Sequence, residues 1–307
     1  MSELSVPVVE GAEPVLEVRG VTVGFAGVIA LDDVSFAVAP RAIHAVIGPN
    51  GAGKSTMFNV LSAVYKADSG SVHFNGTDVT RLHPHQLAGL GVARTFQNIA
   101  LLPGSSVTEN LLLGRHALMR PDLTRPWLRR AHRTRRRHFE RVQEIAAFTG
   151  LADLRATPAG ELSYGDQKRV EIARALCVEP SLLLLDEPAA GMNAHETEAM
   201  AQLIRSIRDS LAIPILLVEH DMGLVMGIAD RVTVLDFGRR IADGTPVQVQ
   251  QDPEVLRAYL GTSSNGDASE QTPISDPSEQ TPISSPSAPT SDPGSRQANP
   301  LQPTQEA

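Results

Sequence analysis

Three short segments in a fixed order constrain the fold of this chain more than any other feature. The first is a glycine-rich loop at residues 48–55, Gly-Pro-Asn-Gly-Ala-Gly-Lys-Ser. The second, at 162–167, reads Leu-Ser-Tyr-Gly-Asp-Gln, and the third, at 182–187, is an apolar run that ends in two acids, Leu-Leu-Leu-Leu-Asp-Glu. An apolar stretch precedes the loop and a helical pattern follows it. This context is typical of a phosphate-binding loop, and it predicts an α/β fold.

Strand and helix patterns alternate along the second half of the chain. Alternation of this kind favours a largely parallel sheet with helices on both faces, into which the mainly helical block at 108–178 is inserted as a subdomain. We expect strands at 15–19, 21–25, 34–38, 43–47, 71–74, 92–96, 182–186, 215–219 and 231–235. We expect helices at 55–63, near 85–90, at 107–113, near 128–149, and at 166–178, 194–210 and 224–229.

The two ends of the chain differ in composition from the rest. From residue 262 onward Ser, Pro, Thr, Gln and Asp dominate, and the segment Ser-Glu-Gln-Thr-Pro-Ile-Ser occurs at 269–275 and again at 278–284. Such a stretch has too few apolar side chains to offset the entropy lost on ordering. We therefore expect a disordered tail at 262–307, a flexible leader at 1–13, and one domain at 14–261. A docking or regulatory role for the tail is left open.

Arginine is concentrated in one segment of an acidic chain. The formal net charge is −8, yet residues 120–141 carry nine Arg against two acids. Only Trp127 and Phe139 are aromatic there. A nucleic-acid surface would interleave more aromatic side chains with the basic ones, so we expect no nucleic-acid partner. A solvated helix face and a contact with anionic lipid or an acidic partner remain the two interpretations.

Features of the whole chain indicate the cytoplasm. The single cysteine, Cys177, excludes an internal disulfide, suits a reducing compartment, and follows an apolar pattern that favours core packing. No apolar run reaches the roughly 18 residues that a membrane-spanning helix needs. The N-terminus lacks the basic region of a secretory signal. We expect a cytoplasmic chain that contacts the membrane through a partner.

The loop at 48–55 carries the residue types that hold a nucleotide. Its glycines allow bends that turn successive N–H groups toward phosphate oxygens, and the following helix adds its positive end. Lys54 is placed to reach the β- and γ-phosphates, and Ser55 to ligate Mg²⁺. A pattern this short also occurs by chance, but the strand before it and the helix after it favour function. The expected contacts in this stretch are Gly48, Pro49, Asn50, Gly51, Ala52, Gly53, Lys54, Ser55 and Thr56.

Two acids end the apolar run at 182–187. Asp186 would lie beside the Mg²⁺ shell, and Glu187 would polarise the attacking water as general base. The alternative is a buried strand that ends in solvated acids. The small-residue loop that follows, at 188–193, argues against this alternative because it suits close backbone contact with a partner.

The segment at 162–167 offers a hydroxyl and backbone N–H groups at the start of an expected helix. Ser163 and Gly165 would then contact the γ-phosphate of a nucleotide. An ordinary helix N-cap is the alternative, and it is the better interpretation of the segment taken alone. Its position between the glycine-rich loop and the two acids favours the phosphate role.

Together with Gln97 and His220, these segments occur in the order of ABC transporter nucleotide-binding domains, and the chain resembles that family over about residues 14–261. A closer resemblance is to ATP-binding subunits of branched-chain amino acid importers, the LivG-like group, whose long insert corresponds to 118–141. It is carried by the segments at 65–70, 91–97, 163–167, 188–191, 219–222 and 257–261. The resemblance implies an ABC-type α/β phosphate-loop NTPase fold, with an antiparallel β subdomain and a helical insert at about 98–178.

The resemblance also implies site roles, with ATP and Mg²⁺ as the bound species. Phe25 would stack on adenine, although a lone Phe in a strand is more often a core residue. Gln97 would sense Mg²⁺ and the γ-phosphate and link the site to membrane subunits. His220 would hold the γ-phosphate and Glu187. The expected catalytic residues are thus Glu187, His220 and Gln97, and the expected metal ligands are Ser55, Gln97 and Asp186.

Partners follow from the same resemblance. Each ATP would lie between Lys54 of one domain and Ser163 of another, so a second ATP-binding subunit is required, identical or, as we expect here, paralogous. Two integral-membrane permease subunits and an extracytoplasmic solute-binding protein would complete the importer, with this chain peripheral on the cytoplasmic face of the inner membrane. The alternatives are urea or amide import, lipopolysaccharide export, and a soluble ABC ATPase outside transport. The sequence does not identify the solute.

Overall fold

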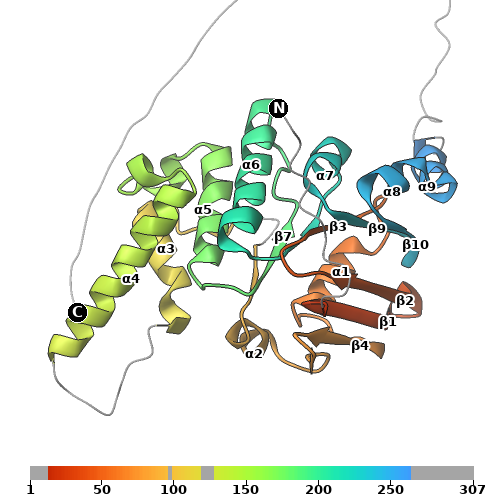
Figure 1. The fold of residues 1–307 in the computed structure, drawn as a ribbon, viewed down its shortest axis with the longest axis horizontal. Coiled ribbons are helices and arrows are strands. Elements are labelled where there is room, and N and C mark those ends of the chain that lie inside the picture. Colours follow the sequence, from red (N-terminus) through yellow and green to blue (C-terminus); the bar gives the residue numbers. More distant parts are fainter. Residues whose placement is uncertain (1–12, 96–98, 119–127, 264–307) are drawn as a thin grey trace, which may run out of the picture. The chain divides into compact units, whose positions relative to one another are not determined.

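Two β-sheets and the helices around them make up the part of the chain described by the computed structural model, residues 13–95, 99–118 and 128–263 (Figure 1). These residues belong to one structural unit, 1–266. Gln97 and most of the expected leader and tail lie outside the described residues, so their roles stay predictions. Among the residues that the structure describes, no helix is long and apolar enough to cross a membrane.

A four-stranded antiparallel sheet is formed mainly by the first part of the chain. Its order is β2-β1-β4-β5, with bounds β1 Leu16–Phe25, β2 Val28–Val38, β4 Ser69–Phe74 and β5 Thr77–Asp78. The bounds predicted for the early strands were wrong, because β1 runs unbroken through Gly20. That glycine, at φ +58°, lies where the register with β2 shifts, so the strand absorbs a bulge instead of ending.

A six-stranded sheet holds the centre of the molecule in the order β10-β9-β3-β8-β7-β6. Its strands are β3 Ile43–Ile47, β6 Val92–Arg94, β7 Leu182–Asp186, β8 Ile215–Val218, β9 Arg231–Asp236 and β10 Arg239–Gly244. Neighbouring strands are parallel except for the β9–β10 hairpin. The carboxyl ends of the parallel strands therefore meet at one edge, which is where ligands bind in sheets of this kind.

The helices were predicted better in the middle of the chain than at its end. They are α1 Lys54–Leu61, α2 Pro84–Gly89, α3 Val107–Gly114, α4 Leu128–Phe148, α5 Tyr164–Leu176, α6 Ala194–Leu211, α7 Met222–Ile228, α8 Pro246–Gln251 and α9 Pro253–Ser263. The sequence interpretation missed α8, α9 and β10. A signal was present for α8: Thr245 and Gln248 form a capping box, and Pro246 stands at the first helical position.

Alternate residues of the central strands pack on opposite faces. On β7, Leu183 and Leu185 join the core formed with α5, α6 and α7, whereas Leu182 and Leu184 join the core that includes α1 and the antiparallel sheet. Coverage of both faces was predicted, and the structure confirms it. Full burial on both sides explains why these strands are continuously apolar.

Helices α3, α4 and α5 pack against one another beside this sheet. On α4, Val142, Ile145 and Ala146 are buried, whereas Arg136 and Arg137 are exposed. Cys177, which follows α5, is fully buried, and burial raises the pKa of its thiol to about 12. Core packing, the predicted role of this cysteine, is confirmed.

A buried histidine on β3 predicts how stability depends on pH. His44 Nε2 lies 2.9 Å from the Thr233 hydroxyl, which in turn donates to Asp243. Burial lowers the pKa of His44 from 6.5 to about 4, so the folded protein keeps it neutral while the unfolded chain protonates it. The free energy of unfolding therefore depends little on His44 above pH 6.5. As pH falls from 6.5 toward 4, protonation of the unfolded chain lowers this free energy, by about 2 kcal/mol at pH 5.

Urea denaturation at pH 7.5 and pH 5 measures this effect. The free energy of unfolding should fall between the two pH values by about 2 kcal/mol more in the wild type than in His44→Gln, which has no proton to gain. An equal fall in both proteins would show that His44 does not carry this acid sensitivity.

Candidate active site

The loop between β3 and α1 requires glycine at two positions. Gly48 has a φ of +150°, and a Cβ there would lie 2.1 Å from the Leu235 carbonyl oxygen. Gly53 has a φ of +99°, and a Cβ there would lie 2.7 Å from the Ala30 carbonyl oxygen. Gly53 is also the N-cap of α1 and offers no side chain to its first N–H groups. The open helix end therefore favours an anion.

Lys54 folds back into this loop. Its Nζ donates to the carbonyl oxygens of Gly48 and Pro49 at 2.7 and 2.8 Å, and the residue is buried. Burial lowers the pKa of the ammonium, and the nearby Glu187 carboxylate opposes that change. A lysine held here is a point charge for phosphate groups that enter the loop.

Asp186 and Glu187 lie at the same edge as this loop, because β8 pairs with both β3 and β7. Asp186 and Ser55 offer a carboxylate and a hydroxyl, the hard oxygen donors that Mg²⁺ prefers. No group of three or more His, Cys, Asp or Glu suited to a metal occurs in the described ranges. Mg²⁺ in proteins is commonly bound by one or two protein oxygens together with phosphate and water, so these two donors fit it. The third expected ligand, Gln97, lies outside the described residues.

An arginine that the sequence interpretation did not single out is bound to Asp186. Arg94, the last residue of β6, donates from Nη2 to Asp186 Oδ2 at 2.7 Å, and both side chains are largely buried. The same guanidinium donates to the Asn59 side chain at 2.9 Å and lies over the Phe58 ring. One carboxylate oxygen of Asp186 is thus committed to Arg94. No local sequence pattern indicates that Arg94 and Asp186 are in contact, because they lie 92 positions apart along the chain.

Glu187 and His220 approach one another. His220 Nδ1 lies 4.0 Å from Glu187 Oε2, with the His220 side chain mostly exposed and that of Glu187 partly exposed. Glu187 has a φ of +45°, an uncommon value for a non-glycine residue. Its N–H donates to the Val218 carbonyl at 3.0 Å, which ties this turn to the end of β8. Strained backbone of this kind is common at functional sites.

Ser163 is the N-cap of α5. Its Oγ accepts from the Asp166 N–H at 3.1 Å and donates to the Asp166 carboxylate at 2.8 Å. The residue is exposed, whereas Gly165 is buried, and a Cβ at Gly165 would lie 3.1 Å from Glu196. Helix α5, which Ser163 caps, packs in the core on one face of β7, whereas α1 packs in the core on the other face (Figure 1). The structure brings Lys54, Asp186, Glu187 and His220 together, and leaves Ser163 and Gly165 apart.

Phe25 is not a core residue. It ends β1 with 44% of its surface exposed, and its ring meets that of Tyr65 edge-on, with the centroids 5.2 Å apart. An exposed ring braced by a second aromatic is available to stack on a planar ligand. Tyr65 lies in the segment 65–70 that carries the family resemblance, and the resemblance assigns it no role. The remaining loop positions differ in exposure: Asn50, Gly51 and Ser55 are exposed, Thr56 is intermediate, and Pro49 and Ala52 are buried.

A buried acid also went unnoticed. Glu219, at the end of β8, is fully buried and accepts backbone N–H groups from both sides of the site. Its sequence signal was an acid directly after an apolar strand and directly before His220.

Replacing Lys54 by alanine should weaken ATP binding itself, because the loop loses the charge that faces phosphate. We expect the dissociation constant to rise about ten- to hundredfold. Isothermal calorimetry measures it, and Arg257→Ala, which removes an exposed charge elsewhere, should bind ATP normally. Unchanged affinity for ATP in Lys54→Ala would show that the loop at 48–55 does not bind the nucleotide.

Comparison with known families and proteins agrees with this geometry. A family model described as "ABC transporter" matches residues 31–190, and one described as "Branched-chain amino acid ATP-binding cassette transporter" matches 239–264. The chain is 41% identical over 253 residues to the high-affinity branched-chain amino acid transport ATP-binding protein LivG of Escherichia coli strain K12, across 81% of this chain and 99% of that protein. It is 39% identical over 255 residues to BraF of Pseudomonas aeruginosa, with the same two shares.

Solved structures are similar over the same extent. A nucleotide-free ATP-binding cassette from an ABC transporter has a TM-score of 0.71 and 32% identity, across 80% of this chain and 99% of that chain. The ADP conformation of MJ1267, also an ATP-binding cassette of an ABC transporter, has a TM-score of 0.72 and 32% identity, across 81% and 100%. With a phosphate loop, an acid pair and a matching fold, this chain belongs to the ABC transporter family as an ATP-binding cassette.

Proposed function

We propose that this chain hydrolyses ATP to energise the import of branched-chain or related amino acids. The observation that carries the proposal is the 39–41% identity to LivG and BraF along 99% of their length, since both are named as branched-chain amino acid transport ATP-binding proteins. The match of 239–264 to a family described by the same solute class supports it.

The residues have distinct roles in this proposal. Lys54 and the N–H groups at the start of α1 bind the phosphates, and Phe25 stacks on adenine. Ser55 and Asp186, with Gln97, would hold Mg²⁺, which neutralises phosphate charge when bound with ATP. Glu187 accepts the proton of the attacking water, and His220 steadies the γ-phosphate beside it. The 4.0 Å approach of His220 to Glu187 supports this pairing of roles.

A second ATP-binding subunit is part of the proposal. Ser163 is exposed, and its helix α5 packs on the opposite face of β7 from α1, so Ser163 is available to the phosphate loop of another chain. Gly165 carries no side chain, so the start of α5 can approach another chain closely, and the helix N-terminus there favours a γ-phosphate. Two opposed domains, each supplying one half of every site, would bring these groups to ATP.

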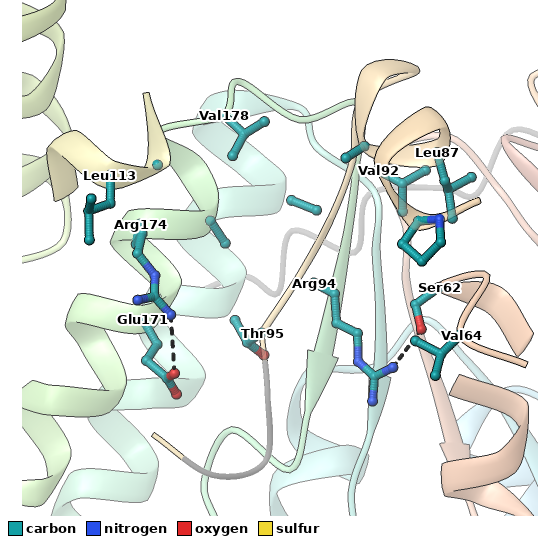
Figure 2. Close-up of a pocket in the computed structure, with 15 residues that line it drawn as sticks. Ser62, Val64, Leu87, Val92, Arg94, Thr95, Leu113, Glu171, Arg174 and Val178 are labelled. Atoms are coloured by element: carbon teal, nitrogen blue, oxygen red, sulfur yellow. Dashed lines mark hydrogen bonds and ion pairs between the residues drawn. The ribbon is translucent and has the colours of Figure 1, made fainter. Parts of the chain in front are cut away.

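The proposed permease subunits need a docking surface on this chain, and one groove has the features of such a surface. A cavity of about 460 Å³ lies between α2 and β6 on one side and α3 and α5 on the other. Figure 2 shows apolar Leu87, Val92, Leu113 and Val178 on the walls, with Arg94 and Thr95 between them. An apolar groove with a few polar groups suits a short segment of a membrane subunit. Docking here would hold the chain peripherally on the cytoplasmic face of the membrane.

Reconstitution tests the proposal. The chain should co-purify with the permease subunits proposed as its partners, and proteoliposomes that also receive the solute-binding protein should accumulate labelled leucine only with ATP. The same vesicles made with Glu187→Gln should not. Leucine uptake without this chain, or ATP hydrolysis by a chain that never associates with permease subunits, would instead favour a soluble ABC ATPase.

A further inference from the structure

Glu219 is the most deeply buried acid beside the site, and the proposed mechanism gives it no role. It follows the last residue of β8 and its exposed fraction is 0%. Burial raises the pKa of its carboxyl, and three backbone N–H groups oppose that change. A buried carboxyl at the edge of a site is kept at a cost in desolvation, so its contacts decide what it contributes.

The two oxygens of Glu219 hold two different segments. Oε1 accepts the N–H of Ala189 at 2.9 Å. Oε2 accepts the N–H of His220 at 3.1 Å and that of Asp221 at 3.4 Å. Ala189 lies in the turn that begins at Glu187, and the other two residues form the turn that carries the His220 side chain. One side chain therefore bridges the backbone on both sides of the Glu187–His220 pair.

We propose that Glu219 is a positioning residue for ATP hydrolysis: by bridging the turn at 187–190 and the turn at 220–221, it fixes the approach of His220 to Glu187. The backbone around Glu187 is otherwise tied by its own N–H to Val218 and by the Ala190 N–H to the Glu187 carbonyl, at 3.0 and 3.2 Å. His220 Nδ1 lies 3.8 Å from Glu219 Oε2 and 4.0 Å from Glu187 Oε2. The His220 Nδ1 atom thus lies within 4.0 Å of both carboxylates. This inference rests on the proposed function and adds a residue to it.

Glutamine at 219 separates positioning from simple filling of space. It has the size of glutamate but only one acceptor oxygen, and its NH₂ cannot accept a hydrogen bond. If the oxygen keeps Ala189, the NH₂ faces the N–H groups of His220 and Asp221. If it keeps those, Ala189 is released. Either arrangement loosens one side of the Glu187–His220 pair.

In the full-length chain, assayed with its partner subunit where turnover requires one, Glu219→Gln should lower kcat about ten- to hundredfold. The KM and dissociation constant for ATP should stay within about twofold of wild type, because the phosphate loop is untouched. In a His220→Ala background the same change should cost much less, so the combined loss falls short of the product of the two single losses. A product of independent losses, or an unchanged kcat in folded Glu219→Gln, would overturn the proposal.

A matched control separates positioning from stability. Asp230 also accepts a backbone N–H, that of Ile43 at 2.8 Å, at the opposite end of β3. Asp230→Asn should lower the melting temperature and leave kcat unchanged. If the control loses as much turnover as Glu219→Gln, the effect is general destabilisation and the positioning role is wrong.

Wild-type hydrogen exchange tests the bridge without any substitution. The amides of Ala189 and His220 should exchange together, and more slowly than those at 191–195. Exchange of Ala189 as fast as 191–195 would contradict the bridge even if Glu219→Gln does not fold. Wild type and Glu187→Gln are assayed alongside. Absence of ATP hydrolysis in the wild type with its partner subunit would refute the proposed function, and hydrolysis that survives in Glu187→Gln would refute the role of Glu187 as general base. Loss of hydrolysis in Glu187→Gln with normal turnover in Glu219→Gln would refute only the role of Glu219.

Discussion

A Glu187→Gln protein is expected to bind ATP as tightly as wild type and to turn it over at least about 10²-fold more slowly. Glutamine keeps the shape of the side chain but cannot accept a proton from water. The turn should persist, because its backbone bonds at Glu187 and Ala190 do not involve the side chain. Steady-state phosphate release and calorimetric ATP binding measure the two halves of this expectation.

The control for that substitution is Glu198→Gln, which removes a carboxylate from the exposed face of α6, where it pairs with Arg205. It should hydrolyse ATP normally. Near-normal hydrolysis in Glu187→Gln itself would show that Glu187 is not the general base. None of the other described residues has been assigned that role.

Ser163→Arg is expected to abolish ATP-driven dimerisation and hydrolysis while leaving ATP binding to the single chain intact. Lys54 and Ser55 of the same chain are untouched, so the phosphates still bind. An arginine in place of an exposed serine is too large to let the start of α5 close on the γ-phosphate of a second domain. Light scattering with and without ATP, together with turnover at rising protein concentration, measures the outcome.

Complementation sharpens this test. If two copies pair, an equal mixture of Ser163→Arg and Lys54→Ala chains contains dimers with one site intact, and part of the turnover should return. If the partner is a paralogue, the mixture should stay inactive, and the wild-type chain should hydrolyse ATP only when the paralogous subunit is added. Normal hydrolysis by a Ser163→Arg monomer would refute both the phosphate clamp and the two-domain mechanism.

Part of any effect of Ser163→Arg comes from the helix itself, because Ser163 caps α5. Loss of such a cap costs about 1 kcal/mol. Ser106 caps α3 in the same way, through the Glu109 N–H, so Ser106→Ala supplies the matched loss of stability away from the site. It should lower the melting temperature by a similar amount and leave hydrolysis unchanged.

The sequence predicted most reliably those elements whose local signals agree. The bounds of β3 and β7 were predicted correctly because each is a short apolar run bounded by a turn. The phosphate loop indicated where α1 begins. The early strands were divided because Gly20 and the polar residues around it resemble strand ends, whereas pairing with β2 carries β1 through them. Pairing between strands is a tertiary effect that no local pattern reports.

The same limit applies to the candidate site. The residues of the glycine-rich loop, Asp186 and Glu187 could be named from motifs because their chemistry requires neighbours in sequence. Arg94 and Glu219 could not, because their partners, Asp186 and Ala189, are distant along the chain. An arginine or a glutamate at the end of a strand is common, and only the fold shows which carboxylate or amide it meets.

Arg94 has a thermodynamic consequence that reaches beyond its contacts. It lines the groove of Figure 2 and also donates to Asp186, so one side chain is shared between that groove and the edge where nucleotide is expected. Any ligand of the groove that favours one position of this guanidinium alters the free energy of binding at Asp186. Linkage is reciprocal: occupancy at Asp186 must change affinity in the groove by the same factor. A ligand in the groove and a ligand at Asp186 would thereby be coupled through a single residue, without either touching the other.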